Sequence, residues 1–290
     1  MPRLFTRLVL SACSLALACT ATQADDSGYI LGAGMTVDNG DGYGVTGLFD
    51  YIFNDATSVS LAVGAAEAAA LPDDVTTRFW SVGFQHDFGG LGVDLRGGQS
   101  GDPSDFDSDD LDVGLFHQGE HWRLAAGWLR RDIDLTFRLT PTRMAREFSL
   151  PLKADGWRAA VSYRTESRWR WSVRARQFDY DRDPTLLGTG FVTQRLSPTT
   201  LTLTGTLLDS SYAASVEIPF KKSRALSLGV ARDVLAGDLA EVETLTLGWL
   251  TPAGERGDLD MSLGISRADG NADETTVFVG ILYLFYGGFD

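Results

Sequence analysis

Eight arginines dominate the chemistry available in the middle of this 290-residue chain. A guanidinium stays protonated at any ordinary pH and presents five N–H donors, so several on one surface attract anions or pair with carboxylates. Neither role needs a nucleophile or a metal. The candidates for a lumen-facing, selectivity-determining set are Arg123, Arg131, Arg158, Arg164, Arg168, Arg170, Arg174 and Arg176.

The segment from Trp157 to Arg164 shows what must position these side chains. Its odd positions carry Trp, Ala, Val and Tyr, and its even positions carry Arg, Ala, Ser and Arg. Successive side chains of a strand point to opposite faces, so the segment has one apolar and one charged face. About fourteen such segments predict strands at 28–38, 42–53, 57–67, 76–88, 91–98, 110–118, 121–137, 155–165, 168–180, 209–220, 223–234, 241–251, 257–267 and 274–286.

The N-terminal 24 residues are typical of a cleaved export signal. Arg3 and Arg7 precede an apolar stretch, and Thr22–Ala24 provides small residues for cleavage. Both cysteines, Cys13 and Cys19, lie in this segment, which leaves lipidation as an alternative to simple cleavage. The expected mature chain therefore has no disulfide, thiolate ligand or cysteine nucleophile.

Charge and hydropathy narrow the possible environments. Removing two of the 25 basic residues leaves 23 against 39 acidic ones, a balance of −16, which excludes nucleic acid as a partner. No apolar run reaches the roughly 18 residues of a membrane-spanning helix. Alternating strands with a lipid-facing and a water-facing side are the remaining way to span a bilayer. We therefore expect one domain at 25–290, an antiparallel up-and-down transmembrane β-barrel.

Connection lengths alternate between short and long, as in outer-membrane barrels with periplasmic turns and longer outer loops. The short ones are 54–56, 89–90, 119–120, 166–167, 221–222 and 252–256. The long ones are 68–75, 99–109, 139–154, 181–208, 235–240 and 268–273. The stretch 181–208 either extends a hairpin or holds a further strand, so the expected strand number is 14 within a range of 12–16.

Aromatic residues gather at predicted strand ends, where amphipathic rings would lie at the level of the lipid headgroups. The predicted periplasmic girdle is Tyr29, Tyr51, Phe53, Phe88, Trp122, Trp169, Phe220, Trp249, Tyr283 and Phe285. Tyr43, Trp128, Trp157 and Tyr212 fall nearer the outer rim.

The segment Val277–Phe285 resembles the closing strand of Gram-negative outer-membrane β-barrels. It departs from their pattern because the last residue is Asp290, with Phe289 before it. The resemblance implies Sec-type export, location in the cell outer membrane, contact with membrane lipids and lipopolysaccharide, and recognition by the barrel-assembly machinery. It names no subfamily, permeant or oligomeric state.

Two interpretations of the arginines remain open. They could pair with carboxylates and stiffen the wall, or form a basic wall that faces an acidic one across water and selects permeants. If the turn at 166–167 set Arg164 opposite Arg168, then Arg158 would oppose Arg174, and such like charges require nearby anions. The candidate inward acids are Asp50, Asp94, Asp112, Glu217, Asp258 and Asp260.

Catalytic and metal sites find little support. His86, His117 and His121 fall at predicted periplasmic ends, opposite to the side on which outer-membrane enzymes act. The acidic run 102–110 lacks the Gly and Glu positions of a helix–loop–helix calcium loop, so we expect a solvated loop. We expect no metal, cofactor or enzyme activity, and a porin-like passive channel for small polar or anionic solutes. A non-conducting structural or surface-interaction barrel is the first alternative, and an outer-membrane lipid-modifying enzyme is the second.

Overall fold

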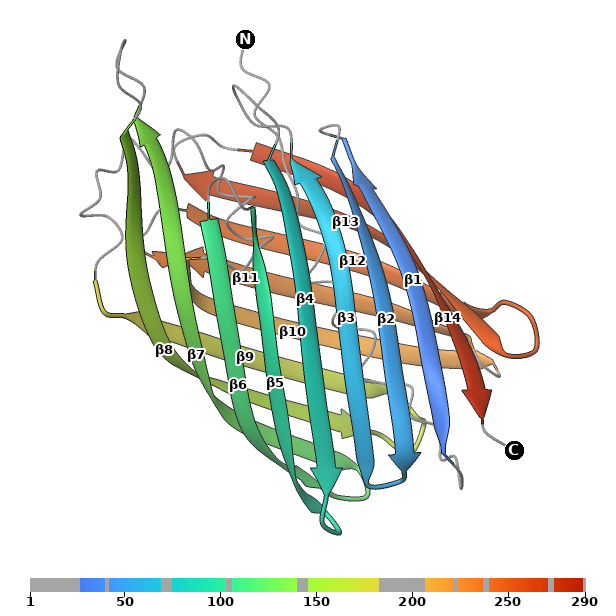
Figure 1. Cartoon of the computed structure of the whole chain (residues 1–290). Coiled ribbons are helices and arrows are strands. Elements are labelled where there is room, and N and C mark those ends of the chain that lie inside the picture. The colour runs from blue at the N-terminus through green and yellow to red at the C-terminus, as the bar shows by residue number, and fades with distance from the viewer. Residues whose placement is uncertain are drawn as a thin grey trace.

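Fourteen antiparallel strands form a closed barrel in which every strand pairs with its sequence neighbours and β14 pairs with β1 (Figure 1). The computed structural model describes residues 27–39, 42–68, 75–102, 106–139, 146–182, 207–221, 224–236, 240–270 and 274–288. No helix within these ranges is long and apolar enough to cross a bilayer. The predicted signal at 1–24, most of the uncertain stretch 181–208, and Phe289–Asp290 lie outside them.

All fourteen predicted strands are present. They are β1 Gly28–Asp38, β2 Tyr43–Asn54, β3 Thr57–Ala68, β4 Val75–Asp87, β5 Leu91–Asp102, β6 Phe106–Gln118, β7 Trp122–Leu139, β8 Arg146–Arg164, β9 Arg170–Tyr180, β10 Leu208–Lys221, β11 Arg224–Leu235, β12 Ala240–Pro252, β13 Gly257–Gly270 and β14 Glu274–Gly288. β1 begins and β14 ends at the same end of the barrel, the lower end in Figure 1, which also carries the short turns.

Two predicted loops are wrong in part because the strands continue into them. The loop predicted at 99–109 is mostly strand, with β5 running to Asp102 and β6 starting at Phe106. The loop predicted at 139–154 is largely β8, which begins at Arg146 and stays paired with β7 up to Leu139. In the second segment the alternation continues, although the apolar and polar faces exchange there, with Leu152 and Ala154 buried and Lys153 exposed.

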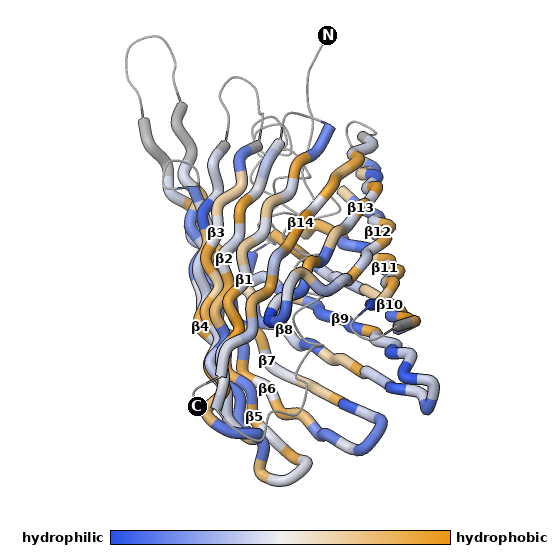
Figure 2. Tube along the Cα trace, turned by 90° about the vertical axis from the view of Figure 1, so that its right-hand side faces the viewer, coloured by the Kyte–Doolittle hydropathy of each residue, from blue (hydrophilic) through white to orange (hydrophobic). Residues whose placement is uncertain are grey.

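The outer surface of the barrel is an apolar band. Large hydrophobic side chains exposed on the strands share the outward face, as with Val161, 40% exposed, and its cross-strand neighbours Leu124 and Val173, 45% and 57% exposed. The hydropathy trace shows apolar and polar residues alternating along the strands (Figure 2). Such a band would suit contact with hydrocarbon, and the closed ladder leaves none of the described strands with an unpaired edge.

The lower edge of this band is the predicted aromatic girdle. Tyr51 packs edge-on against Phe53 with ring centroids 4.6 Å apart, and Phe220 lies 5.0 Å from Trp249 on a neighbouring part of the wall. Trp122 contacts Tyr163 across the β7–β8 pair at 4.3 Å. The first contact lies within β2 and the other two join different strands, and together they confirm that the rings gather at one end.

Near the outer end, the two faces exchange character. On β7 the outward side chains change from Leu124 and Trp128 to Arg130 and Asp132, while the inward side chains become Leu129 and Ile133, both nearly fully buried. The inward apolar side chains form one cluster that joins β6–β8 to β11 and β12. We call it the outer apolar cluster: Phe106, Ile133, Leu135, Leu152, Leu207, Leu235 and Ala240.

Four inward phenylalanines lie over glycines of the adjacent strand. In each case the two residues are direct cross-strand partners, and a Cβ on the glycine would collide with the ring. The pairs are Gly64 with Phe79, Gly92 with Phe116, Gly156 with Phe178 and Gly264 with Phe278. Each glycine thus allows a large ring to lie flat against the wall instead of filling the lumen.

Candidate functional site: the charged inner wall

One row of cross-strand partners organises the charges of the inner wall. Asp94 of β5 is opposite Gly114 of β6, Gly114 is opposite Gly127 of β7, and Gly127 is opposite Arg158 of β8. The row continues to Arg176 of β9, Ser211 of β10 and Asp233 of β11. Two arginines therefore stand side by side, with a carboxylate at each end of the row.

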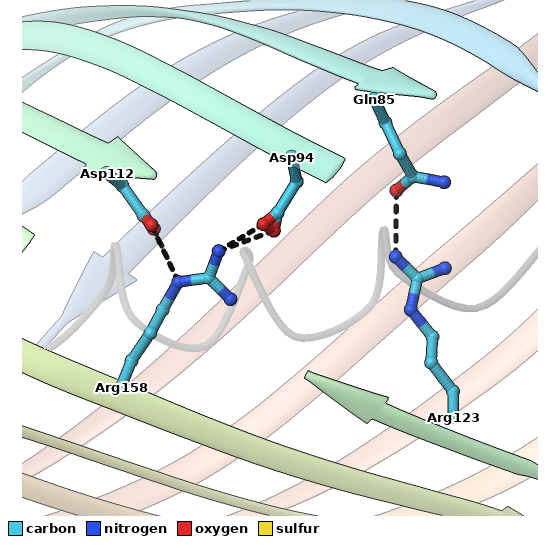
Figure 3. Close-up of polar contacts among 5 residues, drawn as sticks. All are labelled: Gln85, Asp94, Asp112, Arg123 and Arg158. Carbon is cyan, nitrogen blue, oxygen red and sulfur yellow. Dashed lines mark hydrogen bonds and ion pairs between the residues drawn. The ribbon is translucent and has the colours of Figure 1, made fainter. Parts of the chain in front are cut away.

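Arg158 lies along this row and binds two carboxylates (Figure 3). Its Nη2 donates to Asp94, and its Nε donates to Asp112 Oδ1 at 2.8 Å. The side chains of Arg158, Asp94 and Asp112 are 23%, 21% and 23% exposed, so the two ion pairs are partly accessible to solvent. All three belong to β5–β8, and the ion pairs run along the wall instead of bridging the lumen.

Gly114 and Gly127 make the reach of Arg158 possible. A Cβ on Gly114 would collide with the Arg158 guanidinium and the Asp94 carboxylate, and one on Gly127 would approach Arg158 Nε to 3.0 Å. Any side chain at these positions would occupy the path that the arginine follows. The two glycines form a shallow track across β6 and β7.

Arg176 and Arg174 occupy the neighbouring strand β9. Arg176 is half-buried and interacts electrostatically with Asp233, two strands away in the same row. Arg174 has small cross-strand partners on both sides, Ala160 of β8 and Ala213 of β10. Both arginines have the inward orientation that the sequence predicted.

Arg131 and Arg123 lie on β7, toward opposite ends. Arg131 is 7% exposed, donates through Nε and Nη2 to Asp110, and stacks over the Phe178 ring at 4.7 Å. Arg123 donates to Gln85 Oε1 at 2.8 Å and lies over the Phe116 ring at 4.3 Å (Figure 3). Arg131 belongs to the outer end of the wall, beside the outer apolar cluster.

The register expected for the remaining arginines is wrong by two residues on β9. Arg164 opposes Arg170, not Arg168, and Arg158 opposes Arg176, not Arg174. Arg168 belongs to the turn between β8 and β9, where its φ of 66° is in the left-handed region. The turn is longer than predicted because Thr165 N donates to Trp169 O at 2.9 Å. Arg170 lies 3.6 Å from Glu217 of β10.

Several members of the charged wall were missed by the sequence analysis. Arg96 of β5 is inward, exposed and directly opposite Asp112. Asp110 was assigned to the acidic loop, and Asp233 was not considered. Strand parity could have found Arg96, because it shares a face with Asp94. Of the predicted inward acids, Asp94, Asp112 and Glu217 do pair with arginines.

Known structures share this fold at low sequence identity. Protein-family models and curated proteins give no match to the sequence. A TodX deltaS2S3 mutant monoaromatic hydrocarbon channel has a TM-score of 0.53 at 8% identity. The match covers 92% of this chain and 91% of the channel chain. A loop-deletion mutant of OmpT, an outer membrane protein of Vibrio cholerae, has a TM-score of 0.51 at 9% identity, covering 90% and 98%. This chain therefore shares the β-barrel fold of these outer-membrane proteins.

Outside the charged wall, the described residues of the barrel present few chemically reactive groups. His86 Nδ1 lies 2.8 Å from Thr57 Oγ1, and the His86 ring packs edge-on against Phe88 at 4.4 Å, so this pair belongs to the aromatic girdle. In the described part of the acidic run, Asp107 and Asp109 are exposed on β6, while Asp110 points inward. Within the described residues no group of three or more potential ligands could hold a metal ion.

Proposed function

We propose that this barrel is a porin-like passive channel for small polar solutes, with a preference for anions, and has no catalytic role. The observation that carries the proposal is the exposure of inward charges. Arg96 and Arg164 are exposed although they face the barrel interior, and the Arg158 pairs keep about a fifth of their surface. Charged side chains of this kind need water beside them.

The distribution of charge supports the anion preference. Strands β7–β9 contribute only arginines to the charged inner positions, while Asp258 and Asp260 lie on β13, far around the wall. Guanidinium groups remain charged at any working pH. Four carboxylates, Asp94, Asp110, Asp112 and Glu217, pair with three of the seven described inward arginines of β7–β9, so a solute passing these strands meets an excess of positive charge. Exposed loop carboxylates act over only about 8–10 Å at physiological salt. A barrel of this fold is a channel in TodX, so the fold is compatible with transport.

The surroundings of the channel belong to the same proposal. The apolar band would contact outer-membrane lipids, and the charged outward residues above it, such as Arg130 and Asp132, would meet lipopolysaccharide. β14 closes the barrel against β1 and carries the aromatic pattern of a terminal strand, which supports recognition by the barrel-assembly machinery.

A non-conducting structural barrel is the second candidate, and the outer apolar cluster favours it. Phe106 and Leu152 on one part of the wall belong to the same buried cluster as Leu235 and Ala240 on another. Such packing narrows the outer end, and a fully closed outer end would leave the arginines with a structural role alone.

Conductance separates the two candidates. We expect the purified full-length barrel to give discrete conductance steps in a planar bilayer. Under a KCl gradient the reversal potential should indicate preference for chloride. A bilayer in which the inserted protein gives no steps would reject the channel and leave the structural barrel. Steps with cation preference would reject the anion preference but keep the channel.

A further inference from the structure

Three arginines gather around a hollow at the periplasmic mouth, apart from the Arg158 row. The hollow measures about 510 Å³, and its lining includes Arg164, Arg168, Arg170, Glu120, Glu166 and Glu217. It lies at the end of the barrel that carries the short turns and the aromatic girdle. The hollow thus brings together the connection between β6 and β7, the connection between β8 and β9, and strand β10.

The arginines of this hollow are poorly satisfied by the protein. Arg164 and Arg170 are direct cross-strand partners, an arrangement that like charges disfavour. Glu217 lies 3.6 Å from Arg170 Nη1, beyond hydrogen-bond distance, and Nη1 is buried with no acceptor. Among the described residues, the ion pairs involve neither Arg164 nor Arg168. A buried N–H without an acceptor is costly, so the site lacks an oxygen that a ligand could supply.

The turn between β8 and β9 holds the third arginine in place. Trp169 N donates to Thr165 Oγ1 at 3.0 Å, and Arg168 N donates to Thr165 O at 2.9 Å. These bonds fix Arg168 at a φ of 66°, a conformation that a side chain other than Gly, Asn or Asp seldom adopts. The strained turn brings Arg168 to the rim of the hollow beside Arg164 and Arg170.

We propose that this hollow binds a small oxyanion, a carboxylate or a phosphate, through Arg164, Arg168 and Arg170. Guanidinium groups recognise both anions by the same charge-assisted N–H···O bonds. The lining also carries Glu120, Glu166 and Glu217, which balance the three positive charges. Binding is therefore weak, as a solute that must leave the site requires. The location deepens the proposed function by giving permeant anions an exit site, but binding itself does not depend on conductance.

Line broadening in solution tests the site directly. The full-length barrel in detergent micelles is titrated with inorganic phosphate, and the ³¹P line width of the phosphate is measured. A separate titration uses ¹³C-labelled acetate, and the ¹³C line width of the acetate is measured. The Arg164→Gln/Arg168→Gln double variant should bind at least tenfold more weakly than wild type. The matched control is Arg224→Gln/Arg256→Gln, which removes the same charge from two exposed arginines at the same end, one at the start of β11 and one in the turn before β13.

Each outcome decides the proposal. Broadening of either anion by wild type and the control, but not by the Arg164/Arg168 variant, supports it, and the anion that responds identifies the preferred chemistry. No broadening with wild type, or an equal loss in the control, overturns it. Conductance without binding would remove this site and keep the channel, whereas binding without conductance would do the reverse.

Discussion

Arg158 and Arg176 are direct cross-strand partners in β8 and β9, yet the carboxylates with which they interact lie in opposite directions along the row. Arg158 extends over two glycines to Asp94, while Arg176 faces Asp233 across Ser211. The two positive charges are thereby separated along a single row of the wall. This divergence lets the barrel keep adjacent arginines on its inner surface without a carboxylate between them.

A substitution at Gly114 can obstruct the path of the Arg158 side chain without removing any charged residue. In Gly114→Val the new side chain should displace the guanidinium from Asp94, because a Cβ there already collides with both groups. Loss of a charged hydrogen bond predicts destabilisation of about 1–3 kcal/mol, measured by urea unfolding in lipid vesicles. Gly229→Val, at an inward glycine whose nearest neighbour would be 3.9 Å from a Cβ, is the control. Equal destabilisation of both variants would show that the track has no specific role.

Opposite substitutions in the Arg158 group should change ion preference in opposite directions. Arg158→Ser leaves Asp94 and Asp112 unpaired and should shift the reversal potential toward cations. Asp94→Asn/Asp112→Asn leaves Arg158 unpaired and should shift it toward anions. Both are measured in planar bilayers under a KCl gradient. Shifts of the same sign would mean that these residues do not face the conducting path.

Neighbouring residues of β11 should differ sharply in their tolerance of charge. Leu228 faces lipid and is 45% exposed, so Leu228→Arg should cost about 2–4 kcal/mol or prevent assembly. Ser227→Arg introduces the same side chain on the inner face, directly opposite Glu217, and should fold. The folded fraction is measured by heat-dependent gel mobility. Failure of Ser227→Arg alone would reverse the assigned faces of this strand.

The orientation of the barrel is accessible to labelling. The expected mature chain contains no cysteine, so single replacements report their own positions. Asp134→Cys, exposed near the outer end of β7, should react with a membrane-impermeant maleimide on intact cells. Glu166→Cys, in the turn between β8 and β9, should react only after the outer membrane is opened. Labelling of Glu166→Cys alone on intact cells would invert the topology.

Strand order and number were predictable because lipid and water impose a constant alternation over most of each strand. The prediction of strand ends was less accurate where the alternation between outward apolar and inward polar residues ends. On β8 the inward residues Leu152 and Ala154 are apolar and the outward Lys153 is charged, and this part of the strand was predicted as the loop 139–154. The outer apolar cluster depends on contacts between distant strands, which alternation along one strand does not indicate.

The arginine face was also predictable, but its partners were not. A five-residue turn ending at Trp169 shifts the β8–β9 register by two, and a left-handed residue such as Arg168 is not a recognisable turn signal. Arg158 reaches Asp94 across two intervening strands, a distance that only the paired glycines allow. Sequence separation gave no indication of that contact.

The apolar band has an unequal height around the barrel, which would set how the molecule is oriented in a membrane. On β1 it extends from Tyr29 to Val37, but on β7 only from Trp122 to Trp128, because Arg130 follows. With a rise of ~3.3 Å per residue and a tilt of ~40°, the band is about 20–25 Å tall at β1 and about 15–20 Å at β7. Hydrophobic mismatch of this size is relieved by lipid thinning or by tilting of the protein. In a bilayer, the lipid would be compressed beside β7 and β8, or the barrel axis would lean toward them.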